Sequence, residues 1–282
     1  MNTKPHMSLL ILLLLMCTMP VNAAQVIKLE VEIGKNDSSS KNTNIITVDD
    51  KKVRVDYLGT ETEKTDTTPY LLTLNAGKSW VIGNRDKDEF YCADVNMDDF
   101  FRDIGDIVAR VDSFTNAQFS NNKVAVLLQQ PGPEISGYAT THIRLQTTAN
   151  IKASILLKKF GFTLKKVDDI WYAKNMEMHE VKKRWIEALT NSGYEVLDQL
   201  SRELRGNITG PILKQKTVMQ ITNTEKNQID TYIRKLRVLS VQDLKSSEVS
   251  EKVFAQPRCK KIKKSQTKNA AKTMFKEGKL TL

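Results

Sequence analysis

Alternating apolar and polar positions recur along most of this chain. In the clearest run, at residues 138–146, Ala139, Thr141, Ile143 and Leu145 alternate with more polar neighbours. Successive side chains of a β-strand point to opposite faces of a sheet, so this period predicts a half-buried strand. Runs of a similar kind predict further strands at residues 25–33, 45–48, 52–57, 70–74, 78–82, 89–93, 123–129, 169–173, 216–222 and 232–241.

Short polar segments separate the early strands. Asn75-Ala76-Gly77 lies between two of them and predicts a hairpin with a three-residue turn, and residues 83–88 predict a second turn. The longer stretches at residues 34–44 and 59–69 are rich in turn-forming residues, and we interpret them as loops. Strands that follow one another through such short connections pair antiparallel, so the first part of the chain predicts a β-meander.

Two segments have the spacing of amphipathic helices. In residues 96–111 the apolar side chains recur every three or four positions, Asn96 can cap the start, and two acids follow in the first turn. Residues 179–204 show a second such pattern, which Asn191-Ser192-Gly193 should divide into two helices. The patterns together predict an α+β protein, mainly β, with helices laid against one antiparallel sheet.

The N-terminus has the pattern of a secretory signal peptide. Lys4 precedes an apolar stretch at residues 7–16, and Pro20 and Val21-Asn22-Ala23 supply a helix break and a small-residue cleavage site. Spanning a bilayer takes about 20 apolar residues, so this stretch is too short for the alternative of an uncleaved anchor. Lipidation of Cys17 is disfavoured by the residues before it. We expect export, with cleavage after Ala23, to the periplasm or the medium.

The formal charge of +10 is concentrated at the C-terminus. Residues 258–282 contain nine basic residues and one acid, Glu277. The rest of the mature chain is close to neutral, which argues against a nucleic-acid groove in the folded domain. We expect the tail to be disordered and to contact anionic membrane surfaces, although a solvated extension without function is an alternative. The cations expected to make that contact are Lys260, Lys261, Lys263 and Lys264.

Two cysteines, Cys92 and Cys259, follow the predicted cleavage site. In an exported protein they can form a disulfide, or they can be two unrelated thiols, and the sequence leaves both alternatives open. His142 and His179 lack metal-ligand spacing, and the chain has neither a nucleophile elbow nor a phosphate-binding glycine loop. A nucleophile pair of Cys92 and His142 is a weaker interpretation than a strand position for Cys92. We therefore expect no catalytic residue, metal or cofactor, and no enzyme activity.

Five short motifs occur along the chain in the order in which they occur in a group of exported proteins. They are KVRVDY at residues 52–57, the hairpin at residues 71–91, Gly137-Tyr138 followed by His142, DIWYA at residues 169–173, and VFAQP at residues 253–257. On these motifs the chain resembles periplasmic lipoprotein-carrier proteins of the LolA/LolB type. It resembles more closely an uncharacterised exported family that shares their fold. The likeness spans residues 25–257.

That resemblance implies a single curved, incompletely closed antiparallel sheet with helices covering its concave face. It divides the chain into a signal peptide at residues 1–23, a LolA-like β domain with helical inserts at residues 24–257, and the basic tail at residues 258–282. An open sheet with a helical lid can admit an acyl chain, so the implied function is an exported, non-enzymatic carrier for an apolar ligand such as a lipid or lipoprotein acyl chain. No nucleic-acid partner is expected.

We expect the ligand site to be lined by aromatic and apolar side chains, although for any one of them a place in the core is the simpler interpretation. An alternative function is that of an exported protein-interaction module, with a solidly packed sheet and a basic tail that contacts anionic surfaces. The residues expected at the ligand site are Trp80, Phe90, Phe100, Phe101, Ile104, Ile107, Trp171 and Trp185.

Overall fold

The computed structural model describes residues 24–36, 38–59, 68–86, 89–155, 158–174 and 179–261. The predicted signal peptide at residues 1–23 and most of the basic tail, from residue 262 onward, lie outside the described residues.

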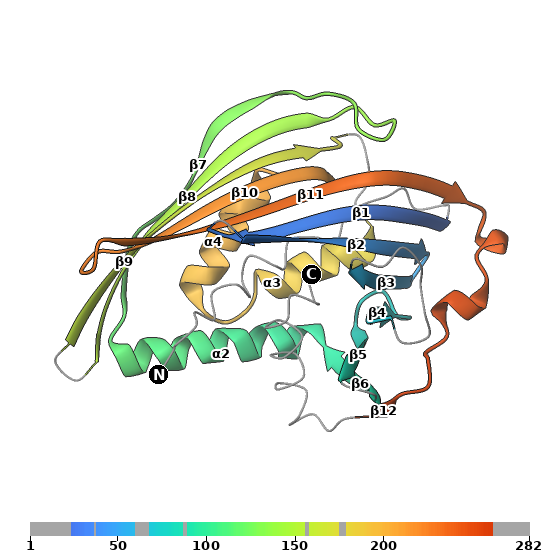
Figure 1. Cartoon of the computed structure of the whole chain (residues 1–282), viewed down its shortest axis with the longest axis horizontal. Coiled ribbons are helices and arrows are strands. Elements are labelled where there is room, and N and C mark those ends of the chain that lie inside the picture. Colours follow the sequence, from blue (N-terminus) through green and yellow to red (C-terminus); the bar gives the residue numbers. More distant parts are fainter. Residues whose placement is uncertain are drawn as a thin grey trace.

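The described chain forms one twelve-stranded sheet in the order β12-β6-β5-β4-β3-β2-β1-β11-β10-β9-β8-β7 (Figure 1). Neighbouring strands pair antiparallel throughout, except that the two-residue strand β12 pairs parallel with β6. The strands are β1 (Ala24–Lys35), β2 (Ser38–Asp49), β3 (Lys52–Gly59), β4 (Tyr70–Thr73), β5 (Ser79–Asp86), β6 (Glu89–Asn96), β7 (Gln118–Pro131), β8 (Thr141–Ile155), β9 (Lys158–Tyr172), β10 (Ile212–Asn223), β11 (Gln228–Leu244) and β12 (Lys260–Lys261).

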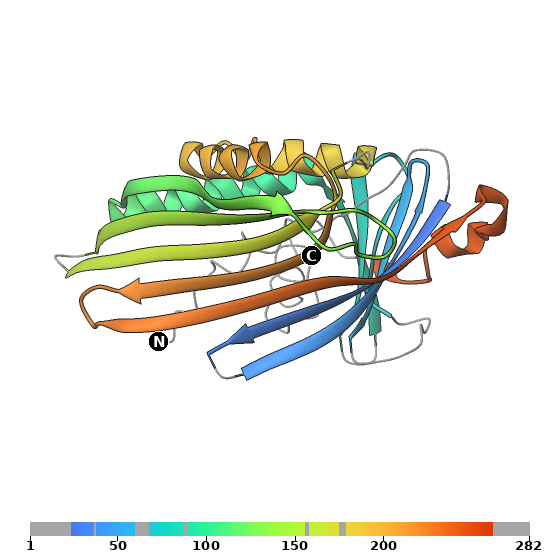
Figure 2. The ribbon, with the colours of Figure 1, turned by 90° about the horizontal axis from the view of Figure 1, so that it is seen from above.

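The sheet is strongly curved and does not close, because β7 and β12 stand at its two ends without pairing with each other. Within the described residues, three helices lie on its concave side: α2 (Met97–Thr115), α3 (Glu180–Leu189) and α4 (Glu195–Gly206) (Figures 1 and 2). Two short 3₁₀ turns, η2 (Ser246–Glu248) and η3 (Glu251–Phe254), follow β11. The predicted fold class, mainly β with helices against the concave face of one open sheet, is confirmed.

The helix boundaries have local causes that the sequence contains. Asn96 caps α2 by accepting a hydrogen bond from the Asp99 backbone N–H, and the first turn is acidic, as predicted. The predicted break between α3 and α4 also occurs, at residues 190–194. There the Asp198 carboxylate accepts hydrogen bonds from Ser192 and from the Gly193 N–H. These bonds satisfy backbone donors that no helix can use.

Gly105 allows α2 to approach the turn between α3 and α4 closely. A Cβ at this position would lie 2.1 Å from the carbonyl oxygen of Ser192, which no side chain can tolerate. Glycine costs about 1 kcal/mol in a helix interior relative to alanine, and here it allows backbone contact between two helical elements. The helices therefore pack on each other as well as on the sheet.

Two parts of the sheet differ from the sequence-based expectation. The serine- and asparagine-rich stretch at residues 34–44 is not a loop from end to end, because β2 begins at Ser38 and pairs with β1 as far as Lys35. Pairing with a neighbouring strand outweighs the weak β-propensity of serine and asparagine. In addition, β8 and β9 extend as a long hairpin through residues 147–168, for which we predicted no strand.

The main core lies between the concave face and the helices, and a second, smaller cluster lies on the convex face beneath the C-terminal segment. Arg54 fastens this segment to β3. Its guanidinium donates to Asp56 at 2.7 Å and to the carbonyl oxygens of Val253 and Ala255 at 3.0 and 3.1 Å. It also lies 4.6 Å from the centre of the Tyr70 ring. Two of the motifs that carry the resemblance, KVRVDY and VFAQP, thus meet in space.

A disulfide bond joins Cys92 of β6 to Cys259, just before β12. Of the two alternatives left open by the sequence, the structure has the paired one. The bond closes a loop of 167 residues and holds β12 against the edge of the sheet.

We predict that Cys259→Ser lowers the free energy of unfolding by about 2–5 kcal/mol, because the unfolded chain loses a long covalent loop. Urea unfolding of the oxidised protein measures this. Wild-type protein treated with a reductant should show the same loss as the variant. An oxidised wild type that unfolds at the same urea concentration as the reduced one would contradict the prediction.

Candidate functional site

Three of the aromatic residues expected at the ligand site form a solid core cluster. Trp80 of β5, Phe101 of α2 and Trp185 of α3 are each at most 3% exposed. The Trp185 ring packs edge-on against Trp80 and Phe101, with ring centres 5.4 and 5.9 Å apart. Phe100 packs against Phe101 at 5.5 Å and is partly buried. This end of the concave face is filled by side chains that hold the helices on the sheet.

The remaining expected residues are not brought together with that cluster. Phe90 stacks on Tyr70 in the convex-face cluster, and Trp171 also lies on the convex face. Trp171 alternates with the buried Ile170 and Tyr172 on β9, and Phe90 packs on Tyr70, so both side chains point away from the helices. Ile104 and Ile107 lie on α2, but their side chains are outside the part of the structure that is described.

A second apolar surface occupies the other end of the concave face, on the long β8–β9 hairpin and β10. The register pairs Ile151 with Phe162 and Leu164 with Ile221, and places Phe160 two positions along β9 from Phe162. All five side chains are half-buried and share the concave face with the buried Ile143 and Ile170. We call this surface the apolar strip; it comprises Ile151, Phe160, Phe162, Leu164 and Ile221.

Sequence analysis missed the apolar strip although a signal for it exists. Phe160, Phe162 and Leu164 alternate with polar or small residues in KKFGFTLKK, which is the period of a strand. Only the pairing of β9 with β8 and β10 brings Ile151 and Ile221 beside them.

A band of buried polar side chains separates the apolar strip from the aromatic cluster. Asp168 of β9 is completely buried. Its carboxylate lies 2.8 Å from Lys166 Nζ and accepts hydrogen bonds from Thr217 Oγ1 at 2.6 Å and from Gln215 Nε2 at 3.1 Å. Arg234 of β11 is the cross-strand neighbour of Thr217 and is also buried. These five residues, which we call the polar band, are Lys166, Asp168, Gln215, Thr217 and Arg234.

The polar band gives the concave face a charged centre between two apolar ends. Buried charges are expensive unless paired, and the contacts of Asp168 with Lys166, Thr217 and Gln215 provide that pairing. The Oε1 atom of Gln215 is buried with no hydrogen-bond partner among the described residues. A polar group at the end of an apolar ligand could therefore accept from Lys166 or donate to Gln215.

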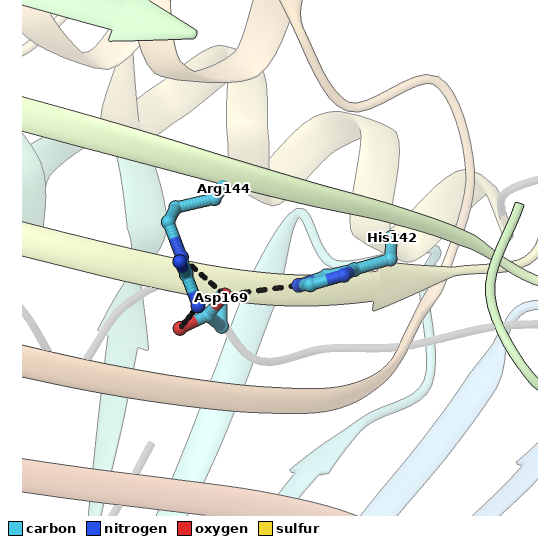
Figure 3. A network of polar contacts seen from close by, with 3 residues as sticks. All are labelled: His142, Arg144 and Asp169. Carbon is cyan, nitrogen blue, oxygen red and sulfur yellow. Dashed lines mark hydrogen bonds and ion pairs between the residues drawn. The ribbon is translucent and has the colours of Figure 1, made fainter. Parts of the chain in front are cut away.

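His142, Arg144 and Asp169 form a polar network on the convex face (Figure 3). The Asp169 carboxylate lies 2.9 Å from His142 Nε2 and accepts two hydrogen bonds from Arg144, at 2.8 and 3.2 Å. Burial raises the pKa of Asp169, but the hydrogen bonds from Arg144 and His142 outweigh this and leave the pKa lowered. His142 also stacks on Trp171, with ring centres 4.3 Å apart. His142 and Cys92 do not form a nucleophile pair, because Cys92 is in the disulfide.

Other candidate chemistry is sparse in the described chain. No three histidine, cysteine or acidic side chains gather there in a way that could hold a metal ion. None of the described helices combines the length and the apolar character needed to cross a membrane. A shallow hollow on α2 is lined by Asp106, Ala109, Arg110, Ser113 and Phe114.

The basic residues expected to contact anionic surfaces are only partly described. Lys260 and Lys261 lie in β12, where their amino groups are 3.0 Å from Glu89 and 3.2 Å from Asp94. Lys263 and Lys264 lie outside the described residues. Lys260 and Lys261 therefore hold β12 against β6 through these ion pairs.

No family model and no curated protein matches this chain. Among solved structures, the chain is similar to a LolA superfamily protein from Nitrosomonas europaea, with 7% identity and a TM-score of 0.29 over 85% of this chain and 93% of that one. It is also similar to a domain from Vibrio parahaemolyticus described as an outer membrane lipoprotein-sorting protein, with 9% identity and a TM-score of 0.26 over 82% and 89% of the two chains. Likenesses this distant carry no argument about function, which has to come from the residues themselves.

His179 joins α3 to the turn between β2 and β3. Its Nδ1 accepts a hydrogen bond from the Val181 N–H at 3.2 Å, and its Nε2 donates to the carbonyl oxygen of Asp50 at 2.6 Å. An imidazole that accepts at one nitrogen is neutral. Burial lowers the pKa of His179, and the hydrogen bond to Asp50 opposes this only in part.

We predict that acidification weakens the attachment of α3. Because the pKa of His179 is lower in the folded than in the unfolded state, its stabilising effect is complete above the unfolded pKa of about 6.5. It is lost as the pH falls through the folded pKa. Urea unfolding at a series of pH values should show a smaller pH dependence for His179→Asn, which keeps a capping side chain but does not titrate. Equal pH dependence in the two proteins would contradict the assignment.

Proposed function

We propose that this protein is an exported, non-enzymatic carrier that holds an apolar ligand, such as an acyl chain of a lipid or lipoprotein, on the concave face of its sheet. The observation that carries the proposal is the apolar strip, a set of large side chains that remain only half-buried on the face that otherwise forms the core. Half-buried phenylalanines beside a filled core have apolar surface to offer to a ligand.

The apolar strip suits a chain-like ligand. It runs across β8, β9 and β10, so a ligand lying on it would contact several side chains at once. Each methylene removed from water contributes about 0.8 kcal/mol, and a moderately long acyl chain therefore needs no specific polar contact to bind. The polar band lies at one end of the strip and is suited to meet the polar group of an amphiphile.

The alternative of a packed interaction module also has an observation in its favour. The aromatic cluster at the other end of the concave face is filled by Trp80, Phe101 and Trp185 and offers no room for a ligand. The two proposals therefore differ at the apolar strip: a carrier keeps it available for a ligand, whereas an interaction module would cover it with protein.

Native mass spectrometry of the protein purified from its own cell envelope tests the carrier proposal. We expect a co-purified lipid whose mass is lost on organic extraction, and a mature chain that begins at Ala24. Protein that carries no lipid, and that takes up no fluorescent fatty acid after purification, would contradict the carrier proposal.

We predict that Phe162→Glu weakens uptake of a fluorescent fatty acid at least about tenfold, because the ligand would have to bury an unpaired carboxylate. Thr163→Glu is the matched control, since it adds the same charge at the next position of β9, on the convex face. Titration of the probe and thermal melting of each protein separate binding from folding. Equal uptake by the two variants would show that the ligand does not lie on the strip.

A further inference from the structure

The convex face of the sheet, on the side opposite the helices, carries more cations than its carboxylates can neutralise. Each carboxylate on the convex face of β1 and β9 already has a cation of its own. The pairs are Glu30 with Lys41 at 3.0 Å, Glu32 with Lys235 at 3.0 Å, and Asp169 with Arg144 at 2.8 Å.

Further cations on this face have no carboxylate within ion-pair distance among the described residues. All of them are exposed, and the strand registers place them on the same side of the sheet as the three pairs. They are Lys28, Lys152, Lys165, Lys214, Lys216 and Arg237.

Four cations on the adjacent strands β10 and β11 form a square. Lys214 is directly opposite Arg237, and Lys216 is directly opposite Lys235. Cβ atoms of directly opposite residues are about 5 Å apart, and residues two positions apart on one strand are separated by about 7 Å. We call these four residues the basic block. Carboxylates lie directly opposite three of these cations on the outer neighbouring strands, but they are already paired with Lys41, Arg144 and Lys235. The block and its neighbours therefore keep a surplus of positive charge, which a bound anion would offset.

An aromatic side chain borders the basic block. Trp171 of β9 is the cross-strand neighbour of Lys214, whose amino group lies 4.5 Å from the centre of its ring. His142 stacks on the same ring from β8 on the other side. Tryptophan beside cations is typical of surfaces that meet the headgroup region of a bilayer. Because neighbours already engage the ring, it is poorly placed to stack on a nucleic-acid base.

We infer that the basic block is a docking surface for the phosphate groups of anionic lipid headgroups at a bilayer surface. It lies on the opposite face of the sheet from the apolar strip, so it would leave the concave face available while the protein rests on the bilayer. The inference is independent of the ligand proposal, since a protein that carries no lipid could still dock in this way.

The test is co-sedimentation of the full chain with vesicles of phosphatidylcholine that contain or lack phosphatidylglycerol. Lys214→Gln combined with Lys216→Gln should weaken binding to the anionic vesicles roughly 30-fold, from about a fivefold loss for each cation near the surface. Lys214→Arg with Lys216→Arg should bind like wild type. The matched control is Lys78→Gln with Lys226→Gln, which removes the same charge from two exposed turn positions and should leave binding unchanged.

Thermal melting of each variant separates docking from folding. Because Lys214 and Lys216 are exposed and neither makes an ion pair within the described residues, the glutamine variant should have a Tm close to that of wild type. The inference is overturned if the glutamine variant binds anionic vesicles like wild type, or if the control loses as much binding. It is also overturned if vesicles without phosphatidylglycerol bind equally well, or if the glutamine variant loses binding only to a duplex oligonucleotide.

Discussion

The sheet depends on the pairing of β1 with β11. The strands from β1 to β6 form one antiparallel meander and those from β7 to β11 form another, and α2 is the connection between them. Only the pairing of β1 with both β2 and β11 joins the two into one sheet (Figure 1). It brings residues about two hundred positions apart into register, so the concave face that the helices cover exists only when the chain is complete up to β11. A pairing of such long range carries a large loop-closure entropy.

The two ends of the sheet are stabilised differently. At the β3–β6 end, the aromatic cluster holds the helices on the concave face, while Arg54 and the disulfide hold the C-terminal segment on the convex face. At the other end, the β8–β9 hairpin and β10 carry half-buried apolar side chains on one face and cations on the other. The first end thus has both faces covered, whereas the second has surface available on both. A carrier that rests on a bilayer and holds an apolar chain would use the second end.

The polar band explains why the concave face cannot be one continuous apolar surface. Lys166 and Asp168 lie between the apolar strip and the core, and each satisfies the charge of the other. A buried ion pair of this kind adds little net stability compared with apolar residues of the same size, so its retention points to specificity. In a carrier, that specificity would concern which end of an amphiphile lies toward the helices.

The sequence by itself determined the secondary-structure classes, the start of α2, and the division between α3 and α4, because alternation, capping residues and glycine act locally. It did not determine the end of α2, which lies at Thr115 and not at Val111. Through the resemblance it also gave the open, curved sheet. It did not reveal β2 at its serine-rich start, since pairing with β1 decides that segment. It also placed Trp80 in one group with Phe90 and Trp171, although Trp80 points to the concave face and the other two point to the convex face. The sequence around an aromatic residue does not show which face of the sheet its side chain joins. The nearly neutral body conceals the basic block in the same way. Composition sums charges over both faces, and only the register between β10 and β11 places four cations side by side.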